Sequence, residues 1–328
     1  MTRKPIRLDL NENHLLDDEY YERLFSQLDV DLADYPSEYS NELCEKLADY
    51  YGLDAGQLLI ANGSDMVLDT IFKTMVPPGG VIGFFEPSYG YYTFLANRNE
   101  RKVLEIPLGS DFTLPSTTDS LEEIDALVVC SPNNPTSLKP DKKHIESLLE
   151  KDLTVIVDEA YAEYSSEDCL DLLSMSSYDN LIITRTFSKV WGLAGIRVGY
   201  AISNTQNIML LKEDMMSYNV NVLSTAAALS ALENHELMEK ALEKTLIERE
   251  YLAEELRLMD FNVLPSETNF LFCRPPHGID PYELYTELSE RGIFIKTFDE
   301  PKIEDFLRVT VGTRDINDEL LDTLGEII

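Results

Sequence analysis

Seven short apolar runs, separated by helical stretches and turns, are the feature that most constrains the fold of this 328-residue chain. Several runs are apolar at every position, as in strands that are buried on both faces of a sheet. The runs span residues 58–60, 81–85, 103–106, 126–130, 154–157, 181–184 and 197–202. Because helical stretches alternate with many of them, the pattern predicts an α/β fold with a mostly parallel, seven-stranded sheet.

The pattern changes after about residue 203. Helix-rich sequence covers residues 225–259, and the runs "NFLFCR", "GIFIK" and "FLRVTVG" follow around one further helix. We therefore expect a large α/β domain at 36–215 and a smaller α+β domain at 216–328, with no flexible linker between them. Residues 1–35 carry too few elements to fold alone, so we assign them to the small domain.

Composition narrows the classes of partner. The net charge is −33 and the pI is about 4.3, which argues against nucleic acid or an anionic membrane as the main partner. No apolar run is as long as the roughly 18 residues that a membrane helix needs. Four cysteines without a CxxC pair and four histidines without metal-site spacing predict reduced thiols, a cytoplasmic location and no metal site.

Polar residues follow several of the apolar runs. In open α/β sheets, ligands bind at the carboxyl ends of the strands, so we expect these residues to meet at one edge. They are Gly63, Ser64, Asp65, Tyr89, Asn133, Asn134, Asp158, Tyr161, Ser188 and Lys189.

Each of these residues also has an ordinary structural interpretation. Asp158 in "VIVDEAY" either caps the next helix or keeps the nitrogen of a bound ring protonated. Ser64 and Asp65 either cap a helix or form a phosphate site at its N-terminus. Asn133 and Asn134 either form a turn or offer an amide donor to a phenolate oxygen.

Lys189 lies in "TRTFSKVWGLAGIRVGY" with apolar residues on both sides. It either ends a strand at the solvent or supplies an amine nucleophile. Together with Asp158 for a ring nitrogen, Arg197 for a phosphate and Tyr89 as a stacking surface, this amine completes the set that pyridoxal phosphate requires.

The ordered motifs "NGSD", "PSYGYY", "SPNNPT", "DEAY", "RTFSK", "ETNF" and "LRVTVGT" resemble the fold-type I aminotransferases. Among these, the sequence is most similar to the histidinol-phosphate aminotransferases, from "LDLNEN" to "VGTRD". The resemblance implies a pyridoxal-phosphate enzyme with a large and a small domain.

The resemblance also implies roles for individual residues. Lys189 is expected to form the Schiff base with the cofactor and to move the substrate proton, while Asp158 pairs with the ring nitrogen. Asn134 and Tyr161 are expected to contact the ring oxygen, and Tyr89 to stack on the ring. The implied phosphate site consists of Ser64, Asp65, Thr186, Ser188 and Arg197.

Further residues are expected to face the substrate or a second subunit. Tyr35 in "ADYPSEYS" resembles a tyrosine that reaches the cofactor phosphate of the neighbouring subunit, which implies a homodimer with shared active sites. Arg308 resembles the arginine that binds the carboxylate of glutamate, and Asn11 resembles a substrate-facing residue. Lys296 stands where the family usually has a second, phosphate-binding arginine, and it keeps the charge without the planar fork.

The leading hypothesis is therefore transamination of histidinol phosphate with 2-oxoglutarate in histidine biosynthesis, with amino acids and 2-oxo acids as substrates. Two alternatives share the fold: a lyase resembling threonine-phosphate decarboxylase, and an aromatic amino acid aminotransferase. A sensor domain that acts on DNA is a further class, but this chain has no basic domain.

Overall fold

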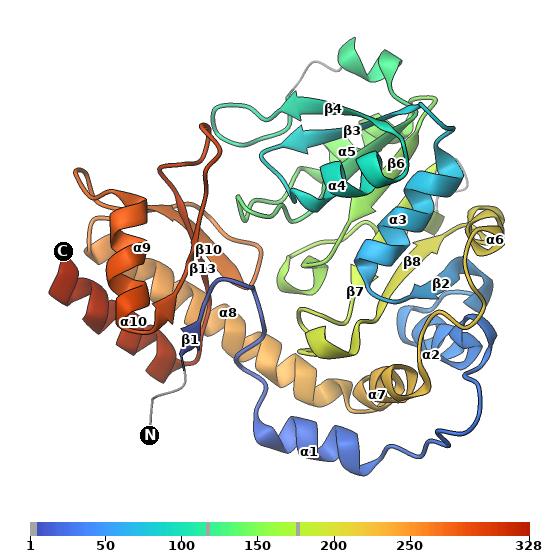
Figure 1. Ribbon diagram of the computed structural model, residues 1–328, viewed down its shortest axis with the longest axis horizontal. Coiled ribbons are helices and arrows are strands. Elements are labelled where there is room, and N and C mark those ends of the chain that lie inside the picture. The colour runs from blue at the N-terminus through green and yellow to red at the C-terminus, as the bar shows by residue number, and fades with distance from the viewer. Residues whose placement is uncertain (1–4, 116–118, 175–177) are drawn as a thin grey trace.

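A seven-stranded sheet forms the centre of the larger part of the computed structural model, which describes residues 5–115, 119–174 and 178–328 (Figure 1). The strand order is β2-β8-β7-β6-β5-β3-β4, and β8 runs in the opposite direction to the other six strands. The strands are β2 (Leu58–Ala61), β3 (Val81–Glu86), β4 (Lys102–Pro107), β5 (Ala126–Cys130), β6 (Thr154–Asp158), β7 (Leu181–Thr186) and β8 (Gly199–Ser203). The predicted mostly parallel sheet is confirmed.

Helices cover both faces of this sheet, which explains why its strands are apolar throughout. In β2, Leu59 and Ala61 pack with α3 and α6, whereas Leu58 and Ile60 pack against α2 on the other face. The helices of this part are α2 (Asn41–Tyr51), α3 (Ser64–Met75), α4 (Tyr91–Arg98), α5 (Lys142–Leu149), α6 (Thr205–Glu213) and α7 (Val222–Glu233).

The smaller part contains an antiparallel sheet with the order β12-β13-β10-β9, beside a two-stranded pair of β1 and β11. Its strands are β1 (Ile6–Arg7), β9 (Asn262–Val263), β10 (Phe270–Arg274), β11 (Ile293–Phe294), β12 (Lys296–Thr297) and β13 (Leu307–Thr310). The remaining helices are α1 (Asp18–Ser26), α8 (His235–Leu258), α9 (Pro281–Glu290) and α10 (Arg314–Ile327). The 24-residue helix α8 runs from the larger to the smaller part (Figure 1).

The predicted domain division at residues 35/36 and 215/216 stays a prediction, and the apolar side chains cluster somewhat differently. Tyr20 and Leu24 of α1 and Ala228 of α7 belong to the core beneath the large sheet. The core of the small part includes Leu8 and, from α8 onwards, starts at Leu252 in the last third of that helix. The long helix thus contributes to both cores, which a boundary drawn from sequence composition does not capture.

Gly199 in β8 allows the start of α3 to lie directly against the sheet. A Cβ atom at this position would lie 2.2 Å from the backbone nitrogen of Ser64 and 2.5 Å from the carbonyl carbon of Gly63. Since both neighbours are backbone atoms, a side chain here would push the N-terminus of α3 away from the strand.

We therefore expect Gly199→Ala to lower the free energy of unfolding by about 1–3 kcal/mol, the usual cost of overpacking a close contact. Gly195→Ala is the matched control, because a Cβ atom there meets nothing within 4 Å. Urea unfolding of both variants measures the effect. Equal stability of the two variants would contradict the role given to Gly199.

Candidate active site

A cavity of about 370 Å³ lies at the carboxyl edge of the large sheet, beneath the chain segment that follows β1. Every residue to which the resemblance gave a role lines this cavity except Tyr35 and Lys296. Gly63 and Asn133, which also follow strands, are not part of its lining. The residues brought together are Asn11, Ser64, Asp65, Tyr89, Asn134, Asp158, Tyr161, Thr186, Ser188, Lys189, Arg197 and Arg308. The expected convergence at strand ends therefore occurs, and residues of the small part complete the cavity.

Asp158 is the last residue of β6 and is only 4% exposed. The hydroxyl of Tyr92 donates a hydrogen bond of 2.7 Å to Oδ2, and the hydroxyl of Thr184 donates one of 3.2 Å to Oδ1. Burial raises the pKa of the Asp158 carboxyl, while these two hydrogen bonds oppose the rise because they stabilise the charged form. The site thus holds a buried carboxylate whose orientation is fixed by two donors.

Sequence reasoning missed both of these donors. Tyr92 comes from α4, 66 residues before Asp158 in the chain, and is fully buried against the sheet. In "SYGYY" it cannot be told apart from its exposed neighbour Tyr91, since only helix packing decides which ring faces inward. Thr184 occupies the β7 position that pairs with Asp158 in the register. A strand alignment made before the structure could have identified it.

Lys189 extends from the turn after β7 into the cavity. Its Nζ lies 3.3 Å from the carbonyl oxygen of Leu10 and 3.4 Å from that of Asn11, both in the segment after β1. Burial, and then the positive charge of Arg308, lower the pKa of the Lys189 amine from 10.5 to about 8. A substantial fraction of the amine is therefore neutral, and nucleophilic, just above neutral pH.

Two side-chain pairs link the small part to the large sheet across the cavity. The amide nitrogen Nδ2 of Asn11 donates a 2.9 Å hydrogen bond to the hydroxyl of Tyr161. Arg308 of β13 donates from Nη1 to Oδ1 of Asn134 and from Nη2 to the carbonyl oxygen of Asp9. Asn11 has a φ of 55°, a left-handed conformation that asparagine tolerates better than most residues.

An anion-binding arrangement lies at the N-terminus of α3. Asp65 accepts hydrogen bonds of 3.2 Å from the hydroxyl of Tyr89 and from Nη2 of Arg197. Gly63 has a φ of 88°, which disfavours other residues, and a Cβ atom there would lie 2.6 Å from Nη2 of the same arginine and displace it. Free backbone N–H groups at the helix start and a nearby guanidinium are the features that bind phosphate.

The hydroxyls of Thr186 and Ser188 line the same cavity, 2.9 Å apart and hydrogen-bonded to each other. The donor set as a whole fits pyridoxal phosphate: an amine, a buried carboxylate, a phenol with an amide, and a phosphate cradle that a Cβ atom at Gly63 would fill. No cluster of three or more potential metal ligands occurs in the described part of the chain.

The two predicted residues outside the cavity lie at the surface. Tyr35 is 85% exposed and its ring centroid lies 5.3 Å from that of Tyr218. Lys296 is exposed on β12, with Nζ 5.8 Å from the centre of the Phe298 ring. Their expected roles therefore stay predictions.

Within residues 5–115, 119–174 and 178–328, no helix is long and apolar enough to cross a membrane.

Comparison with known proteins agrees with this geometry. The family model for class I and II aminotransferases matches residues 6–324. The chain belongs to this family. A histidinol-phosphate aminotransferase of Acinetobacter baumannii (strain AYE) is 34% identical over 312 residues, which cover 94% of this chain and 85% of the relative. One from Synechocystis sp. is 35% identical over 294 residues, covering 89% and 83%.

Solved structures show the same fold at lower identity. Histidinol-phosphate aminotransferase from Sinorhizobium meliloti, in complex with pyridoxal-5'-phosphate, has a TM-score of 0.88 and 22% identity, covering 99% of this chain and 91% of that one. L-threonine-O-3-phosphate decarboxylase from Porphyromonas gingivalis has a TM-score of 0.86 and 22% identity, covering 98% of this chain and 99% of that one. Because both are so distant in sequence, they establish the fold of this aminotransferase family member and not its substrate.

The lowered pKa of Lys189 predicts a pH-dependent stability difference in cofactor-free protein. Below pH 8 the lysine is protonated in both the folded and the unfolded chain, so its burial penalty is fully present. As the pH rises from about 8 to about 10.5, the folded state has lost the proton that the unfolded state still holds, and the penalty disappears. We expect Lys189→Met to be more stable than wild type at pH 7, by a margin that shrinks towards pH 10.

Denaturant unfolding of both proteins at the two pH values measures this margin. The difference between the proteins isolates Lys189, because the other titrating groups are common to both. A margin that stays constant or grows with pH would rule out a desolvated ammonium at this position.

Tyr92→Phe removes one of the two side-chain donors to Asp158. A hydrogen bond to a charged group contributes about 1.5–3 kcal/mol, so the affinity for pyridoxal phosphate should fall about tenfold or more. Tyr91→Phe, at the partly exposed neighbouring position, is the control and should leave the affinity unchanged. Fluorescence titration of the cofactor-free proteins compares them, and equal affinities would remove Tyr92 from the site.

Proposed function

We propose that this protein is a pyridoxal-phosphate-dependent aminotransferase that transfers the amino group of histidinol phosphate to 2-oxoglutarate in histidine biosynthesis. The observation that carries the proposal is the placement of the Lys189 amine, with its lowered pKa, in one cavity with the buried Asp158 and with Arg308. The names of relatives that are 34–35% identical over most of the chain support the choice of substrate.

When bound, pyridoxal phosphate supplies an electron sink that makes the Cα–H bond of an amino substrate acidic. Asp158 provides a fixed negative charge for the ring nitrogen, which strengthens that sink. Lys189 can accept and return the Cα proton, because an amine with a pKa of about 8 populates both forms near neutral pH. Tyr161 and Asn134 provide a hydroxyl and an amide for the ring oxygen.

The substrate end of the cavity requires a cation, because both substrates carry an anionic group. Arg308 is the candidate for this cation. Among the described residues that line the cavity, it is the cation that comes from the small part. Its guanidinium is held by Asn134 and by the backbone of Asp9, so its fork is already oriented before substrate arrives. In a chain with a net charge of −33, such a local cation is what allows an anion to bind.

A substrate screen tests the proposal. Purified protein with added cofactor should form glutamate from histidinol phosphate and 2-oxoglutarate, and it should do so faster than with phenylalanine as the donor. Lys189→Ala should abolish both the visible absorbance of the bound cofactor and all turnover, whereas the surface variant Lys73→Ala should keep both. Release of CO2 from phosphothreonine without glutamate would instead establish a lyase, and a preference for phenylalanine would establish an aromatic aminotransferase.

We also propose that the enzyme is a cytoplasmic homodimer in which Tyr35 completes the phosphate site of the other subunit. The exposed position of Tyr35 beside Tyr218 supports this, since a large exposed aromatic pair is typical of a surface that becomes covered. Four buried free cysteines fit a reducing compartment.

Mixed dimers test the shared site. Tyr35→Ala should bind the cofactor weakly, and Lys189→Ala should be inactive. A dimer that combines one chain of each has one site with both Lys189 and Tyr35 intact, so refolding the two variants together should restore tight cofactor binding with activity. If the mixture binds the cofactor no more tightly and is no more active than Tyr35→Ala alone, Tyr35 does not contribute to the site of a neighbouring subunit.

A further inference from the structure

An ion-pair network lies across the large sheet from Asp158, with Arg185 and Glu159 buried and the Asp168 side chain 36% exposed. Arg185 of β7 is almost fully buried and donates from Nε and Nη2 to Oε2 of Glu159, at 3.0 and 2.7 Å. Its Nη2 also donates to Oδ2 of Asp168 at 2.7 Å. The guanidinium carbon lies 5.1 Å from the centre of the Tyr51 ring, which packs on the opposite face of the sheet from Tyr92. The network therefore does not touch the cavity itself.

Two members of this network, Glu159 and Arg185, are chain neighbours of cavity residues. Glu159 follows Asp158, and Arg185 precedes Thr186. The backbone N–H of Glu159 also donates to the carbonyl oxygen of Thr184 at 2.9 Å. The Arg185–Glu159 pair thus joins β6 and β7 at their carboxyl ends, immediately before the turns that carry Tyr161 and Lys189.

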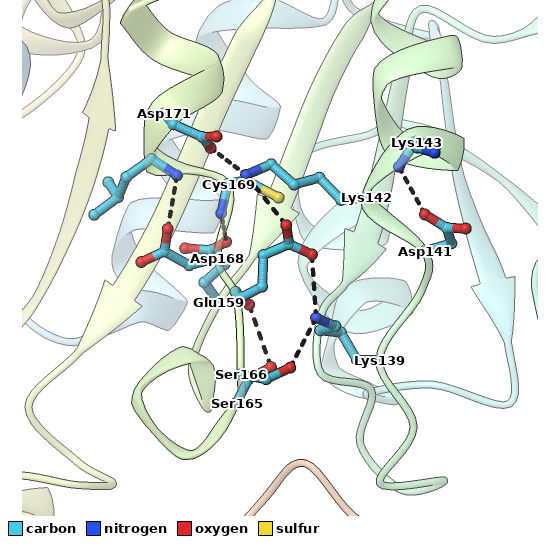
Figure 2. Close-up of polar contacts among 12 residues, drawn as sticks. Lys139, Asp141, Lys142, Lys143, Glu159, Ser165, Ser166, Asp168, Cys169 and Asp171 are labelled. Carbon is cyan, nitrogen blue, oxygen red and sulfur yellow. Dashed lines mark hydrogen bonds and ion pairs between the residues drawn. The ribbon is translucent and has the colours of Figure 1, made fainter.

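The second acid, Asp168, comes from the surface segment 165–171. Two lysines contact this segment. Lys139 contacts Glu167 at 3.3 Å. Lys142 pairs with Asp171 (Figure 2). The backbone N–H of Cys169 in the same segment donates to Oε1 of Glu159 at 2.7 Å (Figure 2). The segment is therefore attached on its outer side to Lys139 and Lys142 and on its inner side to Glu159 and Arg185.

Segment 165–171 also contacts the small part of the protein. The backbone N–H of Ser166 donates to Oε2 of Glu267 at 2.9 Å, and the N–H of Glu267 donates to the carbonyl oxygen of Ser137. Glu267 lies just before β10. The strand β10 pairs with β13, which carries Arg308. The segment that supplies Asp168 to the network thus also contacts the chain that leads into the small sheet, where Arg308 lies.

A buried ion pair is a poor way to gain stability, because the cost of removing two charges from water offsets most of their attraction. What it adds over an apolar contact is geometry, since a guanidinium fork fixes the distance and angle of the carboxylates that it binds. We propose that Glu159, Arg185 and Asp168 are positioning residues for the proposed transamination. They fix β6 and β7 in register, so that Asp158 and Lys189 keep their relative placement around the cofactor.

The test compares Asp168→Asn with Asp171→Asn in the holoenzyme. Both variants remove one carboxylate of segment 165–171, but the Asp171 carboxylate pairs with Lys142 and not with Arg185. With histidinol phosphate as the donor, Asp168→Asn should lower kcat about tenfold or more, because small misplacements of catalytic groups are costly, with less change in KM. It should also shift the pH at which the visible absorbance of the bound cofactor titrates. Asp168→Glu should recover part of the wild-type kcat and part of the wild-type absorbance titration. Asp171→Asn should change neither kcat nor this titration.

Thermal unfolding of the same variants separates positioning from stability. If Asp168→Asn lowers only the thermal midpoint, while kcat and the absorbance titration stay at wild-type values, the network is structural and the inference is wrong. If this variant does not fold, Arg185→Lys decides in its place, because it keeps the charge and loses the fork. The proposed function fails if histidinol phosphate is not a substrate. The absorbance titration needs no turnover, so it still tests the positioning role of the network in that case.

Discussion

The site depends on a carboxylate that is buried at the end of a strand. Removing the charge of Asp158 from water is unfavourable, and it becomes tolerable only because the hydroxyls of Tyr92 and Thr184 donate to both of its oxygens. These donors come from a helix and from the neighbouring strand, so the packing of α4 on the sheet and the register of β6 against β7 are both requirements of the chemistry. A cationic ring nitrogen is the partner that this charge suits.

The second requirement is to bind anions in a strongly acidic chain. In a chain with a net charge of −33, local cations are needed for this, and Arg197, beside the start of α3, and Arg308 both line the cavity. The arrangement at the start of α3 needs close approaches of the backbone, which Gly63 and Gly199 permit. Lys189 lies between the two cationic regions, and its burial beside Arg308 keeps its amine partly neutral.

Transamination requires that one amine serve both as a nucleophile and as a proton carrier, so its position relative to the ring must be stable over a catalytic cycle. The structure holds this position from two directions. The segment after β1 covers Lys189 through the carbonyl oxygens of Leu10 and Asn11. The Arg185–Glu159 pair joins the two strands that carry Lys189 and Asp158 on the face away from the cavity.

The sequence by itself determined the seven strands, because runs that are apolar at every position are typical of a sheet buried on both faces. It also located most of the site, since parallel strands bring their carboxyl ends, and thus Ser64, Asp158 and Lys189, to one edge. Tertiary structure alone decided that Tyr92 faces Asp158 while Tyr91 does not, that α8 belongs to both cores, and that Lys296 lies outside the cavity. Those outcomes depend on how helices and sheets pack across long sequence separations, which local patterns of polarity do not encode.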